Sequence, residues 1–129
     1  MPSFVGLASK IVDKGLENTD LSMLPWDKKM VLLTDVAILL HKRGNYDDAV
    51  KAIIMSGNVI RMRLWVDEFL KTNKVKQATL CAIALKDKEK LERLGMMCMK
   101  EGYYRVAADA FKKVGKNDLA EFVKMNFLF

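Results

Sequence analysis

The side chains best able to act as nucleophiles, bases or metal ligands in this chain are Cys81, Cys98 and His41. A thiolate can attack a substrate or bind zinc, and an imidazole can move protons near neutral pH. The cysteines stand seventeen positions apart inside apolar helical patterns, whereas zinc sites and disulfide frameworks need more Cys or His at clustered spacings. His41 precedes Lys42 and Arg43 at a predicted helix end, where cations complement the last carbonyl groups. We predict two reduced core thiols, a structural His41 and no metal site.

The other residues form no catalytic pattern. The seven glycines are isolated, without the spacing of a phosphate-binding loop or a strand before it. Carboxylates are spread along predicted helix faces, where they are most simply exposed to solvent. We therefore expect a non-enzymatic protein without a cofactor.

A net charge of +6, from 22 Lys and Arg against 16 Asp and Glu, raises the question of an anionic partner. Much of the excess falls at predicted helix ends, where cations are favourable. The remaining basic cluster is Arg61, Arg63, Lys74 and Lys76. It suits an acidic protein segment, anionic lipid headgroups or nucleic acid. Trp65 lies within the apolar pattern, which favours core packing over stacking on bases, so RNA or DNA binding is the alternative hypothesis.

The sequence ends on the apolar run Phe127, Leu128 and Phe129, after the last predicted helix. Helical arrays need polar terminal surfaces to stay soluble. The run therefore indicates docking on another copy, a partner chain or further repeats, or folding back over the last hairpin. We predict an interface over residues 118–129, with self-association as one form of it.

A short pattern recurs along the chain and organises it. Residues that match in type stand 58 positions apart, with a third copy halfway between them, so the unit is 29 residues long. The first copy contains Gly44, Tyr46 and Ala49, the second Val75 and Ala78, and the third Gly102, Tyr104 and Ala107. A period between about 20 and 50 residues is typical of stacked helical repeats, in which no unit buries its apolar face alone.

Apolar spacing and turn residues predict helices throughout. The expected helices cover residues 4–14, after Ser3 as a cap, and then 26–42, 46–56, 59–70, 74–85, 88–99, 104–114 and 118–126. No run alternates with the period of two that marks a strand. We expect one domain with an N-terminal helix (1–16), a loop (17–25), three hairpins (26–57, 58–86 and 87–115), and a C-terminal helix with an apolar tail (116–129).

The repeated positions have a packing explanation. Small residues let two helix backbones approach closely, and a large residue at the helix entrance fills the wedge beside them. The small positions are Ala49, Ala78 and Ala107, and the large positions are Tyr46, Val75 and Tyr104. The hairpins are therefore expected to interlock through equivalent residues.

These residues resemble a known type of repeat. Gly44, Tyr46, Ala49, Ile53 and Ser56 look like the second-helix half of a tetratricopeptide repeat, and Leu91, Leu94 and Gly95 match its first-helix half. The period of 29 instead of 34, with the bulky Trp65 and Phe69, is more similar to the α-solenoids of clathrin heavy chain, coatomer, vacuolar tethering-complex subunits and intraflagellar transport complex A subunits.

The resemblance implies an all-α fold, a right-handed α-solenoid of about three antiparallel helical hairpins with an N-terminal capping helix. It implies a protein–protein interaction scaffold in a membrane-trafficking or ciliary transport assembly, in contact with other subunits. The longest apolar stretch, residues 30–40, is too short and too interrupted to span a bilayer. We expect a cytoplasmic location, at the cilium or on endomembranes.

Overall fold

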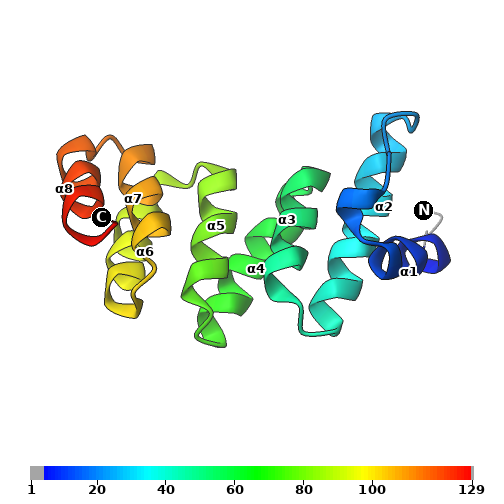
Figure 1. The fold of residues 1–129 in the computed structure, drawn as a ribbon, viewed down its shortest axis with the longest axis horizontal. Helices are drawn as coiled ribbons and strands as arrows, with labels where there is room; N and C mark the ends of the chain where they lie inside the picture. Colours follow the sequence, from blue (N-terminus) through cyan, green and yellow to red (C-terminus); the bar gives the residue numbers. More distant parts are fainter. Residues whose placement is uncertain (1–4, 129) are drawn as a thin grey trace. The chain divides into compact units, whose positions relative to one another are not determined.

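The computed structural model describes residues 5–128, and within them it contains eight α-helices, one 3₁₀ turn and no strand. The elements are α1 (Val5–Lys14), η1 (Leu16–Asn18), α2 (Trp26–Lys42), α3 (Tyr46–Ser56), α4 (Val59–Lys71), α5 (Val75–Leu85), α6 (Lys88–Glu101), α7 (Tyr104–Lys113) and α8 (Asn117–Phe127) (Figure 1). The all-α prediction is confirmed. Ser3, Phe4 and Phe129 lie outside the described residues.

The helix contacts divide the chain into two compact units, Met1–Val59 and Ile60–Phe129. We refer to them as unit 1 and unit 2. No helix in the described part of the chain is both long and apolar enough to cross a membrane.

In unit 1, α1 packs on α2 and α2 packs on α3. Buried residues recur along α2 at the spacing of one helix face, and they meet the buried face of α3. These α2 residues are Leu32, Leu33, Val36, Ala37 and Leu40. The predicted loop 17–25 begins within a short 3₁₀ turn, η1. This turn follows Gly15, whose backbone has a positive φ of 100°. Gly15 suits this conformation because it has no Cβ.

In unit 2, α6, α7 and α8 lie side by side, and α5 contacts both α6 and α7 (Figure 1). Phe111, fully buried on α7, packs against the α6 backbone at Gly95, which is also buried. A buried hydrogen-bond chain joins α5 and α6: the Cys98 thiol donates to Thr79 Oγ1 (3.2 Å), and the Thr79 hydroxyl donates to the Val75 carbonyl (2.8 Å). The core thus satisfies its polar groups internally.

One turn geometry recurs at the predicted 29-residue interval. One or two positions beyond the end of each helix from α2 to α7, a residue adopts a left-handed conformation. These residues form two series, Gly44, Asn73 and Gly102, and Gly57, Lys86 and Gly115. In the first series the next residue donates its backbone N–H to a carbonyl five positions earlier, as in Tyr103 N to Cys98 O at 2.9 Å. This bond satisfies a carbonyl that the helix end leaves without a partner. Lys86 is the member of the two series whose residue type does not predict this conformation.

The small positions are equivalent, whereas the large ones are not. Ala49, Ala78 and Ala107 each have 0% of their surface exposed. Tyr46, Val75 and Tyr104 each begin a helix, yet only Val75 is buried, at 3% exposure. Tyr46 makes an edge-to-face contact with His41 of α2, and Tyr104 stacks on Phe127 of α8. The aromatic contacts at the large positions therefore differ, because the Tyr46 ring contacts α2 and the Tyr104 ring contacts α8.

Candidate functional site

Aromatic rings of α7 and α8 contact one another at the surface of unit 2. Phe127 stacks on Tyr104 with ring centroids 4.6 Å apart, and Phe122 meets Phe127 edge-on at 6.3 Å. Phe122 is 54% exposed, Met125 on the same helix is 68% exposed, and Phe127 is 42% exposed. We call Tyr104, Phe122, Met125 and Phe127 the α7–α8 aromatic cluster. It presents large apolar groups to solvent next to a well-packed core.

The structure locates Phe127, the first residue of the predicted apolar run, within this cluster. Phe127 is the last residue of α8 and lies against its own chain through Tyr104, as the folding-back alternative expected. It nevertheless keeps much of its ring exposed, and Leu128 is half-buried. Phe122 and Met125 had not been singled out. Their signal is the helical spacing of α8, in which Ala120 and Val123 are buried and Phe122 and Met125 fall on the opposite face of the helix.

The four predicted basic residues do not form one compact patch. Arg61 and Arg63 lie near the start of α4, and Lys74 and Lys76 lie around the start of α5, beyond the other end of α4. At 1.5 Å per residue, roughly 15 Å of helix separates the two pairs. The Lys76 ammonium lies 5.8 Å from the centroid of the Tyr103 ring, a cation–π distance.

Positive charge is instead a property of unit 2 as a whole. Unit 2 has fifteen Lys and Arg against nine Asp and Glu, whereas unit 1 has seven of each. The entire net charge of +6 therefore belongs to the unit that carries the aromatic cluster.

The two cysteines are free and buried, as predicted. Burial raises the pKa of the Cys81 thiol to about 12. Burial also raises the pKa of Cys98, against a smaller lowering by its hydrogen bond with Thr79. Both thiols are therefore protonated at neutral pH and unsuited to nucleophilic attack. Among residues 5–128, no three His, Cys, Asp or Glu side chains gather as a metal site would require.

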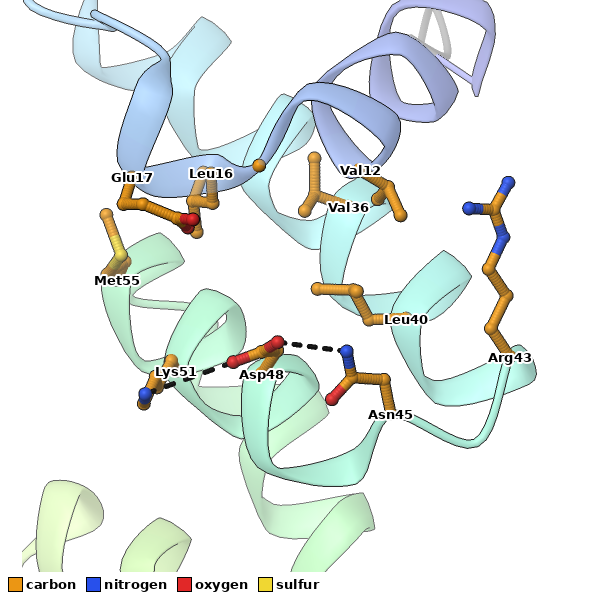
Figure 2. Close-up of a pocket in the computed structure, with 11 residues that line it drawn as sticks. Val12, Leu16, Glu17, Val36, Leu40, Arg43, Asn45, Asp48, Lys51 and Met55 are labelled. Atoms are coloured by element: carbon orange, nitrogen blue, oxygen red, sulfur yellow. Dashed lines mark hydrogen bonds and ion pairs between the residues drawn. The ribbon is translucent and has the colours of Figure 1, made fainter.

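Unit 1 contains a pocket of about 590 Å³ that sequence reasoning missed (Figure 2). Its apolar lining comes from α1, η1, α2 and α3. The residues are Val12 of α1, Leu16 of η1, Val36 and Leu40 of α2, and Met55 of α3. The pocket exists because η1 lies near α3 on the face of α2 that carries Val36 and Leu40. No sequence motif signals it, since it depends on how a loop residue such as Leu16 meets distant helices.

Comparison of the chain with protein-family models gives no match. Searches of curated proteins and of solved structures likewise find none. The fold therefore defines an all-helical protein whose neighbouring helices pack on one another. Its surfaces are the features that bear on function.

Proposed function

We propose that this chain is a non-enzymatic protein-interaction module that binds a partner through the α7–α8 aromatic cluster. The supporting observation is the exposure of Phe122, Met125 and Phe127 around contacting aromatic rings. Contiguous apolar surface is uncommon on proteins that act alone, and aromatic residues and Met are enriched where proteins bind one another. The rings are already packed together, so binding costs little side-chain entropy.

The partner that fits this surface is an acidic protein segment with apolar side chains. Fifteen basic against nine acidic residues give unit 2 a positive field, which attracts and orients an acidic chain. The apolar side chains of that segment would cover Phe122 and Met125, and burial of such groups provides about 25 cal/mol per Å² of apolar surface.

The wider assignment builds on the repeat. The 29-residue spacing of buried alanines and left-handed turn residues supports a right-handed α-solenoid of about three antiparallel hairpins with an N-terminal helix. Its resemblance to the repeats of clathrin heavy chain, coatomer, tethering-complex and intraflagellar transport subunits leads us to propose a place in a cytoplasmic trafficking or ciliary transport assembly.

A nucleic-acid adaptor is the second candidate, and the charge of unit 2 favours it. The positions of the basic residues favour a protein partner instead, because the two pairs lie at opposite ends of α4. Trp65, the aromatic residue nearest to Arg63 in sequence, is 4% exposed and cannot offer a face for base stacking.

The test compares proteins captured by the wild-type chain with those captured by the double variant Phe122→Ser/Met125→Ser, identified by mass spectrometry. The control is Leu7→Ser, which removes a 46% exposed apolar side chain from unit 1. We expect the wild-type chain to capture acidic proteins, and to capture less of them as the salt concentration rises. The double variant should lose these proteins, and the Leu7→Ser control should retain them. Identical sets for all three chains would refute the proposal.

A parallel titration with a single-stranded RNA and a single-stranded DNA decides between the two candidates. Phosphate contacts make affinity fall steeply as salt rises, so tight binding at low salt with that dependence would establish the alternative. Light scattering over a concentration series identifies a second copy as the partner if the mass rises in the wild type and the control but not in the double variant.

A further inference from the structure

The pocket of unit 1 has the size and composition of a ligand site. Its volume of about 590 Å³ lies within the roughly 300–1,000 Å³ of small-molecule pockets, which combine apolar walls with a few polar groups. Val36 and Leu40 of α2 are almost completely buried beneath it, at 0% and 7% exposure. Met55 is 50% exposed and Leu16 is half-buried, so an apolar ligand has contact surface to cover.

Most charges at the pocket mouth are already balanced. Arg43 lines the pocket, and its Nη1 lies 3.0 Å from Oδ1 of Asp13, a residue that does not line the pocket. Asp48 accepts a hydrogen bond from the Asn45 amide at 2.9 Å, and its other oxygen lies 3.9 Å from Lys51 Nζ. Figure 2 shows both interactions of Asp48 as dashed lines.

Glu17 is the exception. Its carboxylate also lines the pocket, but it has neither an ion pair nor a side-chain hydrogen bond to another residue in the described range. Figure 2 shows it beside Leu16 and away from Arg43. With Arg43 held by Asp13 and Lys51 held by Asp48, the Glu17 carboxylate is left without a cation partner next to apolar walls. An apolar body with one positive group complements both features.

We propose that this pocket binds a small amphiphile in which an alkyl or aryl group bears a single ammonium group. The apolar body covers Leu16, Leu40 and Met55, and the ammonium lies at the mouth near Glu17. An alkyl carboxylate would contact the same apolar walls, but its negative charge would be repelled by Glu17. Because Glu17 is exposed, solvent screens the attraction, and we expect about a three- to tenfold preference for the cation.

The experiment uses the full chain and two probes of equal length, n-octylammonium and octanoate, below their micelle concentrations and at equal ionic strength. Methyl and amide NMR resonances report binding at each site separately. We expect octylammonium to shift the Leu16, Leu40 and Met55 methyl resonances saturably, and octanoate to bind about three- to tenfold more weakly. Glu17→Gln should remove this preference while apolar binding remains.

Asp27→Asn is the matched control, because Asp27 is an exposed acidic residue of unit 1 that does not line the pocket. It should leave the preference unchanged. A second variant, Met55→Lys, places a cation at the mouth and should reduce octylammonium binding at least about tenfold. Equal affinity for the two probes, no shift at the pocket, or shifts confined to α8 would each overturn the proposal. None of these results bears on the α7–α8 aromatic cluster, which lies in the other unit.

Discussion

Replacement of Gly95 by Ala tests the close approach of α6 and α7 that the structure shows in unit 2. A Cβ at position 95 would lie 2.7 Å from Phe111 Cε1, and 3.1 Å from both Cδ1 and Cζ of that ring. Ordinary carbon contacts are about 3.5–4.0 Å, so the ring must withdraw by about 1 Å. Phe111 is 0% exposed in a closely packed core, where it has no free space to enter.

Two opposing energies decide the outcome. Gly to Ala within a helix stabilises by about 1 kcal/mol, because Ala loses less backbone entropy on folding. Inserting a methyl group into a filled core costs about 1–3 kcal/mol. Since the shortest contact involves the edge of a buried ring and not the tip of a flexible chain, we expect a net destabilisation of about 1 kcal/mol.

The assay is urea unfolding followed by tryptophan fluorescence. The chain has two tryptophans, Trp26 in unit 1 and Trp65 in unit 2, so a Trp26→Phe background makes the signal report unit 2. Trp65 is buried beside Phe69, with ring centroids 5.7 Å apart, and its emission should change on unfolding. Gly95→Ala should lower the urea midpoint without changing the denaturant slope.

Phe111→Leu provides the decisive comparison, because it removes the ring that the new methyl group meets. In that background Gly95→Ala should become stabilising, towards the helix-propensity gain of about 1 kcal/mol. Gly6→Ala is the control, since a Cβ there has open space around it within α1, and it is measured with Trp26 retained so that the signal reports unit 1. It should not destabilise the protein. If Gly95→Ala has the same effect with and without the Phe111 ring, the packing argument is wrong.

Three further predictions concern the repeat and the core. Ala107→Leu should overpack the crossing at a fully buried site and cost about 1–3 kcal/mol in urea unfolding, whereas Asp109→Leu, on the exposed face of the same helix, should change stability by less than about 0.5 kcal/mol. Lys86→Gly should stabilise by about 0.5–1 kcal/mol, because φ is 58° there, whereas Arg93→Gly, at an exposed position in the interior of α6, should destabilise by about 1 kcal/mol. Thermal melts that rank the two variants alike would contradict this. Cys81 ionises in the unfolded chain above its ordinary pKa of 9.0 but in the folded chain only near 12, so its contribution to stability is complete below pH 9 and should fall by about 1.4 kcal/mol per pH unit above it, a slope that Cys81→Ala should reduce.

The helices could be predicted from the sequence because their ends have local causes. The bounds of α2 and α3 match the prediction, since Pro25 precedes the first and a left-handed glycine closes the second. Lys86 shows the limit of this reasoning. Lysine has no preference for the left-handed region, and only its place 29 residues after Gly57 and before Gly115 identifies the turn.

The candidate sites were less predictable, because they depend on which helix faces remain uncovered. The apolar tail indicated Phe127 correctly as part of an exposed apolar surface, but the more exposed Phe122 and Met125 follow only from the packing of α8 on α7. The unit 1 pocket needs the position of Leu16 and Glu17 against α2 and α3, and no local preference encodes that position.

The residues that repeat and the residues that could recognise a ligand are separate sets, for a physical reason. Close helix approach requires small buried residues such as Ala49 and Ala107, which have no surface left for a partner. Recognition must come from outward positions, and these differ between the units. Unit 2 combines exposed aromatic rings with excess positive charge, whereas unit 1 combines a pocket with balanced charge overall and an unpaired Glu17 at its mouth. Because salt screens the broad field of unit 2 more than apolar contacts inside a pocket, raising the ionic strength should weaken the two binding surfaces to different extents.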